Sequence, residues 1–277
     1  MLAPRTGRLL IAAAALLWST GGLAIKLVPL SGLGVAFWRS LFTFLFLMVV
    51  FRPSRAMWAR ASVSTAVVYA AMILSFVSAT KLTTAANAIF LQYSAPLYVL
   101  LLAPFLLKER FRKADAVAIA IALSGMSLFF VGRLEKGQLL GNVLGAVSGL
   151  FFGGTVLLLR RDTTRDPMAS MLLGSLLAAV AALPFAWGHL ALDTRGVALV
   201  VFLGCVQMGV SYWLFVRGLA VVPAAEASLI GMLEPMFSPL WVFLGVGERP
   251  SGWALLGGAI VLLSVTGRTI WASRERA

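Results

Sequence analysis

The sequence predicts an all-α membrane protein with ten transmembrane helices, arranged as two inverted five-helix repeats. Hydrophobic residues make up 61% of the 277 residues and charged residues only 12%, whereas soluble domains are about half apolar and about a quarter charged. So few charges cannot cover so apolar a chain in water, and lipid must therefore surround it. The other two observations are a series of apolar segments of spanning length and a similarity between the two halves of the chain.

The apolar segments fit a bilayer, because a helix of about 20 residues covers the roughly 30 Å of hydrocarbon. Turn-forming or charged residues separate them, as at Pro29–Ser31, Arg52–Arg55 and Lys108–Arg110. The first segment is too long for the apolar core of a signal peptide, and we interpret it as an uncleaved span. The ten expected spans cover residues 8–29, 34–52, 62–80, 84–107, 115–132, 140–159, 168–188, 196–216, 223–245 and 251–271.

Positively charged residues predict the orientation of these spans. With ten spans, sixteen of the 23 lysines and arginines fall on the side that holds both termini, six fall on the other side, and Arg39 lies within a span. Because lysine and arginine concentrate in cytoplasmic loops, we expect a multi-pass protein of a bacterial-type inner membrane with both termini in the cytoplasm. The same rule explains the net charge of +13 without a nucleic-acid partner.

Several classes of chemistry are excluded by residue counts. Cys205 is the single cysteine and His189 the single histidine, and no lysine follows a glycine. A cysteine-rich zinc site, a histidine cluster and a phosphate-binding loop of the GK[ST] type are therefore impossible. We expect no enzyme activity, no metal and no cofactor.

The two halves of the chain resemble each other. Placing Pro96 on Pro235 also places Glu109–Arg110 on Glu248–Arg249, and a second alignment places Trp18 on Phe152. Each half then holds five spans, and an odd number of spans forces the two halves into opposite orientations in the membrane. The expected repeats are residues 1–135 and 136–277.

These motifs resemble the drug/metabolite transporter superfamily of EamA type across essentially the whole chain. The segments that carry the resemblance are Ala15–Trp18, Phe37–Arg39, Leu106–Arg110 and Gly245–Arg249, within stretches 78–132 and 217–267 that look like two copies of one domain. The resemblance implies ten helices in two inverted halves. It also implies export or exchange of amino acids or other small metabolites.

Polar residues within the spans are candidates for a substrate pathway. Trp18 lies about 15 Å of helix rise from Arg8, near the membrane midplane, where an aromatic ring can stack on a flat or cationic ligand. The alternative for Trp18 is packing in the core or against lipid. Polar stripes should face the interior of the bundle, either as a cavity or as hydrogen bonds between helices. The expected substrate-binding residues are Trp18, Asn87, Tyr98, Gln207, Ser211 and Glu226.

Three charged residues within the spans raise separate questions. Glu226 and Glu234 both lie in the ninth span, where a charge is costly, and either could couple protonation to transport. The alternative is a carboxyl that only fixes a helix contact. Arg39 lies close enough to the outer surface to snorkel, which we take as the simpler expectation, although it could also pair with an acid or bind a substrate carboxylate.

Four glycines form one smooth face of the sixth span, at Gly141, Gly145, Gly149 and Gly153. Small residues allow close approach of helices in a membrane. We expect this face to contact another helix, as static packing or as a sliding surface.

The sequence is compatible with three functions. The first is a secondary exporter or exchanger of small metabolites, with amino acids or related compounds as substrates. The second is an organic-cation or drug exporter of the same superfamily, which the aromatic residues and the two membrane acids would suit. The third is a membrane scaffold that transports nothing. The sequence leaves the oligomeric state open.

Overall fold

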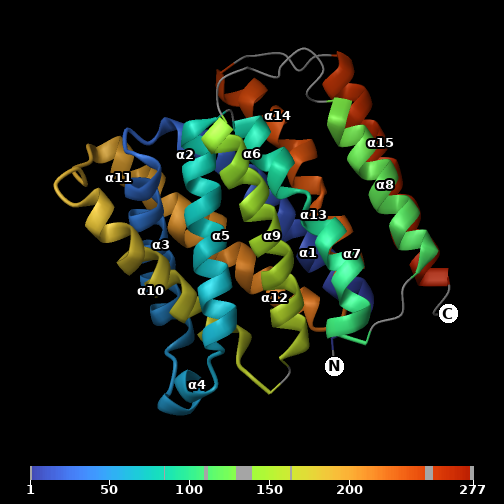
Figure 1. Ribbon diagram of the computed structural model, residues 1–277, viewed down its shortest axis with the longest axis horizontal. Helices are drawn as coiled ribbons and strands as arrows, with labels where there is room; N and C mark the ends of the chain where they lie inside the picture. Colours follow the sequence, from blue (N-terminus) through green and yellow to red (C-terminus); the bar gives the residue numbers. More distant parts are fainter. Residues whose placement is uncertain are drawn as a thin grey trace.

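The computed structural model describes residues 2–83, 85–108, 112–128, 139–162, 164–246 and 252–274, and within them the chain is all helical (Figure 1). The first half contains α1 Pro4–Ser19, α2 Gly21–Leu27, α3 Gly32–Phe51, α4 Arg55–Ala59, α5 Val63–Leu82, α6 Ala85–Gln92, α7 Ala95–Leu106 and α8 Lys113–Ser127. The second half contains α9 Leu139–Arg161, α10 Pro167–Ala186, α11 Thr194–Val201, η2 Phe202–Val210, α12 Ser211–Leu219, α13 Ala224–Gly231, α14 Leu233–Val246 and α15 Gly252–Arg274.

Seven helical stretches among the described residues are long and apolar enough to cross a membrane. They are Pro4–Leu27, Gly32–Phe51, Val63–Leu82, Asn87–Leu106, Leu139–Arg161, Pro167–Ala186 and Thr194–Leu219. The other three expected spans contain α8, the pair α13 and α14, and α15, but their described parts include no apolar stretch of that length. The multi-pass helical class is therefore confirmed, whereas the count of ten spans stays a prediction.

Polar side chains at the loop boundaries explain where several helices begin. A helix leaves its first N–H groups without partners, and a side-chain oxygen just before the first turn can accept from one of them. Five helices begin in this way, with the acceptor–donor pairs Ser31–Gly34, Ser54–Met57, Ser62–Thr65, Asp166–Ala169 and Asp193–Gly196. The apolar runs between these caps form the spans.

Among the described residues, two spans are broken just before a proline, one in each half of the chain. α6 ends at Gln92 and α7 begins at Ala95, while α13 ends at Gly231 and α14 begins at Leu233. A proline follows each break, at Pro96 and Pro235, and proline has no N–H to donate to the carbonyl four residues earlier. Each break therefore presents backbone polar groups inside the membrane region.

The bundle packs around α5 and α9, while α8 and α15 lie side by side at one edge (Figure 1). A buried ion pair joins these two outer helices, with 2.6 Å between Arg268 Nε and Asp115 Oδ1. In Figure 1, α1 begins and α15 ends toward the lower part of the view, where α4 also lies.

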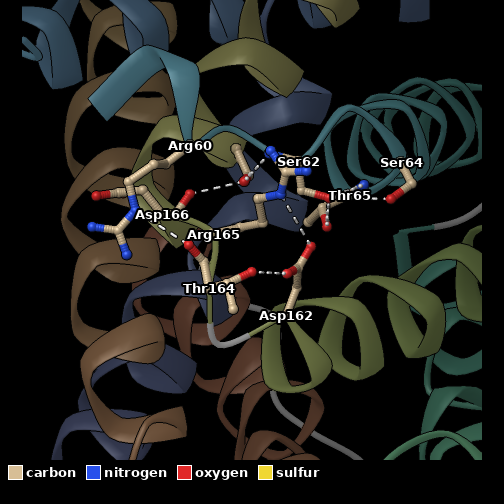
Figure 2. Close-up of polar contacts among 9 residues, drawn as sticks. Arg60, Ser62, Ser64, Thr65, Asp162, Thr164, Arg165 and Asp166 are labelled. Atoms are coloured by element: carbon tan, nitrogen blue, oxygen red, sulfur yellow. Dashed lines mark hydrogen bonds and ion pairs between the residues drawn. The ribbon is translucent and has the colours of Figure 1, made fainter. Parts of the chain in front are cut away.

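A polar network connects two loops at this lower end of the bundle (Figure 2). Arg60, between α4 and α5, donates to the carbonyl of Thr164 at 3.2 Å, and its own carbonyl accepts from the N–H of Asp166 at 2.8 Å. The backbone N–H of Ser62 donates to the hydroxyl of Ser170 on α10 at 2.9 Å. The connection between α9 and α10 is thereby fixed to the start of α5.

The four glycines of α9 face the end of α5 and the helices α6 and α7. A Cβ atom at Gly149 would lie 2.8 Å from the carbonyl oxygen of Leu91 and would also collide with Ser94 Oγ. Added Cβ atoms at Gly141 and Gly145 would meet atoms of the neighbouring segments at 2.8 Å and 3.0 Å. This face therefore lies in close contact with α6, the first part of a broken span.

Candidate functional site

The candidate site is a small cavity in the centre of the bundle, with a volume of about 30 Å³. One water needs roughly 10–15 Å³ of such space, so the cavity holds about two waters. The cavity is lined by Trp18, Arg39, Met72, Ile73, Phe76, Gln92, Phe152, Gln207, Met208, Tyr212 and Glu234. These side chains come from α1, α3, α5, α6, α9, η2, α12 and α14, so helices from both halves of the chain meet here.

Aromatic rings form one wall of the cavity. The ring of Trp18 lies 5.9 Å from that of Phe152 in an edge-to-face arrangement and 5.0 Å from that of Tyr212. Tyr69 contacts Tyr212 edge-to-face, also at 5.0 Å. Such pairs add to the burial of apolar area, and Trp18, Phe152 and Tyr212 all line the cavity.

Arg39 supplies a buried positive charge to the cavity. The residue is only 4% exposed, and its Nη2 donates to Gln207 Oε1 at 2.8 Å and to Met208 Sδ at 2.6 Å. Its Nε and Nη1 atoms are buried without a hydrogen-bond partner. The expectation that Arg39 snorkels to the surface is therefore wrong, because the side chain turns inward toward Gln207 and the centre of the bundle.

Gln207 connects Arg39 to the end of α1. Its amide nitrogen donates to the carbonyl of Trp18 at 3.1 Å, while its amide oxygen accepts from Arg39. The segment that carries it, η2, is a π-helix, a conformation that occurs often at functional sites. The hydroxyl of Ser211, one turn later, donates to the backbone carbonyl of Gln207.

Glu234 supplies an acidic group to the same cavity and joins the two broken spans. The hydroxyl of Tyr93, at the break between α6 and α7, lies 2.7 Å from Glu234 Oε2 and 2.7 Å from the carbonyl oxygen of Gly231. In an unbroken helix the N–H of residue 235 would donate to the carbonyl of Gly231, but Pro235 has no N–H. Arg39 and Glu234 interact electrostatically, and no direct ion pair between them occurs among the described residues.

Comparison with known proteins identifies the family. The model of the EamA-like transporter family matches the chain twice, over residues 5–131 and 139–269. This chain belongs to the EamA-like transporter family. It is therefore a multi-pass membrane protein of a transporter family and not an enzyme.

Individual relatives of this EamA-family chain agree with that assignment. It is 28% identical over 272 residues to the uncharacterized transporter YwfM of Bacillus subtilis, covering 93% of this chain and 91% of the relative. It is also 28% identical over 269 residues to an uncharacterized transporter of Archaeoglobus fulgidus, covering 94% and 95%. One solved crystal structure matches with a TM-score of 0.83 at 19% identity, covering 98% of this chain and all of that one; this likeness shows the fold alone.

The EamA-family cavity brings together only some of the residues selected from the sequence. Trp18, Gln207 and Glu234 line it. Ser211 lies beneath it, bonded to the backbone of Gln207. Glu226 lies elsewhere, in a buried ion pair with Arg8 on α1, with 2.6 Å between Arg8 Nε and Glu226 Oε1.

The other two selected residues lie outside the lining of this cavity. Asn87 Nδ2 donates to the hydroxyl of Thr83 at 3.2 Å, close to the start of α6. Tyr98 is half-buried on α7, and its Cβ would lie 3.2 Å from a Cβ added at Gly153. The motif residues Glu109, Arg110, Glu248 and Arg249 lie outside the described residues. No group of three potential metal ligands occurs in the part of the chain that the structure describes.

Sequence reasoning missed the tertiary partners rather than the polar residues themselves. Arg39 was noticed as a charge within a span, and its buried position follows from Gln207, 168 residues away. Met72 and Phe76 gave no signal, because apolar residues in a transmembrane helix look alike whether they face lipid or a cavity.

Proposed function

We propose that this EamA-family protein is a secondary transporter that exports or exchanges small zwitterionic metabolites, amino acids or related compounds, through the central cavity. The observation that carries the proposal is Arg39, whose buried guanidinium has two nitrogens without a hydrogen-bond partner and which lines the same cavity as the carboxyl group of Glu234. A charge inside a membrane protein is costly, and one whose hydrogen-bonding groups remain unfilled is suited to a ligand that fills them.

The guanidinium of Arg39 is proposed to bind the substrate carboxylate. Guanidinium groups bind carboxylates with two parallel hydrogen bonds, and these charge-assisted bonds are about twice as strong as neutral ones. Each parallel pair of donors on a guanidinium includes Nη2, together with either Nε or Nη1. In Arg39, Nε and Nη1 make no hydrogen bond, and Nη2 is bonded to Gln207 and Met208, so the substrate must take over Nη2 to complete the fork.

Glu234 and the aromatic wall are proposed to receive the substrate ammonium group. A carboxylate and the faces of Trp18 and Tyr212 both attract a cation. Because Arg39 would repel an organic cation that lacks a carboxylate, these contacts favour a zwitterion over the alternative of an organic-cation or drug exporter. The further alternative, a scaffold without transport activity, gives no reason for opposite charges within one buried cavity.

Two inverted five-helix repeats, residues 1–135 and 136–277, are the architecture that we propose for this transporter. Two separate matches to one family model support it. The breaks at Tyr93 and Met232 support it as well, because each precedes its proline, Pro96 or Pro235, by three residues. Broken helices at equivalent places in two repeats are typical of transporter binding sites.

The contact between Trp18 and Phe152 fits the same proposal. The second internal alignment makes these residues equivalents of each other, and their rings touch at 5.9 Å. Equivalent residues meet in space when they lie close to the axis that relates two repeats. We accordingly place this axis, and the substrate, beside the aromatic wall.

The orientation proposed for the chain follows from its charges, with ten spans in a bacterial-type inner membrane and both termini in the cytoplasm. The beginning of α1 and the end of α15 lie toward one end of the bundle (Figure 1), as an even number of spans requires. A reporter enzyme that works only outside the cytoplasm should be inactive when fused at Ala277. Activity of that fusion would contradict the proposed topology.

The cavity must enlarge during transport. Its 30 Å³ is far smaller than the roughly 300–1,000 Å³ of common ligand pockets. We propose that Asn87, Tyr98, Ser211 and Glu226 face the pathway only after the helices move, and that the glycine face of α9 permits part of this movement. Cysteines introduced at Asn87 and Ser211 should then react with a small polar reagent during turnover and not in the resting protein.

Contacts at two ends of the bundle are proposed to close the pathway. On one side, the ion pair of Arg8 and Glu226 holds α1 against α13. On the other side, Lys26 Nζ donates to the carbonyl of Thr83 at 2.7 Å, and Lys81 Nζ donates to the carbonyl of Val28 at 2.6 Å. Opening toward either side would break one of these sets.

A matched set of ligands tests the proposed function. The purified transporter should be stabilised against heat by an α-amino acid, and much less by the same compound without its carboxylate or without its amine. The Arg39→Gln variant should lose the stabilisation. Equal stabilisation by the decarboxylated amine would favour the organic-cation alternative, and the absence of any response to a broad panel of zwitterions would contradict the proposal.

A further inference from the structure

Both polar atoms of the Gln207 carboxamide make hydrogen bonds. Its oxygen accepts from Arg39 Nη2 at 2.8 Å, and its nitrogen donates to the carbonyl of Trp18 at 3.1 Å. The residue is 2% exposed and lines the cavity. One side chain therefore contacts the charge of the site and the end of α1 at the same time.

This amide is a weak ligand for Arg39. Among the contacts of the described residues, the guanidinium bonds to no acidic oxygen; it has the neutral amide of Gln207 and the sulfur of Met208. An amide oxygen bonds a guanidinium through one hydrogen bond and without a charge, whereas a carboxylate offers two oxygens and a full charge. A carboxylate that reached Arg39 would therefore compete successfully with Gln207.

We propose that Gln207 is the internal ligand of Arg39 that the substrate carboxylate displaces, and that it thereby sets substrate affinity and reports binding to the end of α1. This inference rests on the proposed function, since it requires a substrate with a carboxylate. In the empty transporter, the Gln207 oxygen occupies part of the carboxylate position. When substrate binds, Arg39 turns from Gln207 to the carboxylate.

The surroundings of Gln207 explain how its release reaches α1. A Cβ atom added at Gly21, the first residue of α2, would lie 2.5 Å from Gln207 Nε2, so the amide lies directly against the junction of α1 and α2. A side chain at position 21 would push the amide of Gln207 out of this position. Once Arg39 no longer holds the amide oxygen, the bond from Gln207 to the Trp18 carbonyl loses its second anchor, and α1 is freer to pivot at Thr20.

Gln207→Glu gives the sharpest test, because it places a carboxylate of the same shape on Arg39. We expect the affinity for an amino acid that binds the wild type to fall by more than about tenfold, as expected for the loss of a charge-assisted hydrogen bond. Gln92→Glu is the matched control, since it adds the same charge to the same cavity, and no hydrogen bond joins Gln92 to Arg39 among the described residues. Its loss of affinity should be clearly smaller.

Gln207→Leu separates competition from a structural role by the sign of its effect. Removing the competing oxygen should tighten binding by about threefold to tenfold, the range for one net hydrogen bond. If Gln207 only supported the fold, both substitutions would weaken binding. If Gln207→Leu does not fold, the comparison of Gln207→Glu with Gln92→Glu decides alone.

The possible failures are distinguishable. If the wild type binds no carboxylate compound, or binds one without depending on Arg39, the proposed function fails. If the wild type binds an amino acid through Arg39 and Gln207→Glu binds it as tightly as Gln92→Glu does, the proposed function stands and the displacement of Gln207 is wrong. Weaker binding by Gln207→Leu would also overturn the displacement.

Discussion

The hydroxyl of Tyr93 lies 2.7 Å from Glu234 Oε2 and joins the break between α6 and α7 to the break between α13 and α14. The same hydroxyl bonds to the carbonyl of Gly231 that Pro235 leaves without a donor. The two breaks are thereby linked to each other and to the carboxyl group that lines the cavity.

The first prediction concerns Arg39. Replacing it with glutamine should weaken binding of a zwitterionic substrate by about 10- to 150-fold, the equivalent of roughly 1.5–3 kcal/mol for a hydrogen bond to a charged group. Arg39→Lys should recover only part of this loss, because lysine keeps the charge and lacks the planar fork. Ligand-dependent thermal shifts measure both, and full affinity in Arg39→Lys would refute recognition by a fork.

The second prediction concerns proton coupling through Glu234. If this carboxyl carries a proton during transport, Glu234→Gln should still exchange substrate across proteoliposomes without responding to an imposed pH gradient. Tyr93→Phe, which removes the hydroxyl that contacts Glu234 and the Gly231 carbonyl but keeps the carboxyl group, should keep the response at a lower rate. Equal responses in wild type and Glu234→Gln would exclude coupling through this group.

The third prediction concerns the buried ion pair of Glu226 with Arg8. Glu226→Gln should destabilise the protein by about 3–5 kcal/mol, because it leaves Arg8 without its buried carboxylate partner. Asp162→Asn is the control, since it breaks a more exposed pair with Arg165 at 4.0 Å that should contribute at most about 1 kcal/mol. Thermal unfolding in detergent compares them. A similar small effect for both variants would show that the Arg8 pair contributes little.

The fourth prediction uses two glycines in helices. Gly149→Ala should lower thermal stability, because the new methyl group would lie 2.8 Å from the carbonyl oxygen of Leu91. Gly267→Ala, on α15, meets nothing within 4 Å and should be neutral or stabilising by up to about 1 kcal/mol, since alanine favours helices. An unchanged melting temperature for Gly149→Ala would indicate a looser contact between α9 and α6.

Composition and hydropathy were sufficient to predict the class of this protein, because lipid imposes the same length and polarity on every span. The sequence also matched Pro96 to Pro235, and in the structure each of these prolines follows a break in its span, because proline has no N–H to donate to the carbonyl four residues earlier. The ion pair of Arg8 and Glu226 could not be predicted. It joins residues 218 positions apart, and hydropathy carries no information on which faces of two helices meet.

The candidate site was predictable only in part for the same reason. Gln207 and Trp18 were found because polar and aromatic residues are conspicuous within apolar spans. The orientation of Arg39 was not found, because a charge five residues inside a span can reach either the membrane surface or the core. Its direction depends on Gln207 and Met208 from η2, which only the folded chain brings near.

Counterflow tests the central claim most directly. Proteoliposomes loaded with an unlabelled amino acid are given the same labelled compound outside, for a panel of zwitterions, with the decarboxylated amine of each as a matched control. We expect transient accumulation of at least one zwitterion by the wild type, little for its amine, and none by Arg39→Gln. Accumulation of the amine at the same rate as the amino acid, or unchanged accumulation by Arg39→Gln, would show that Arg39 does not recognise a substrate carboxylate.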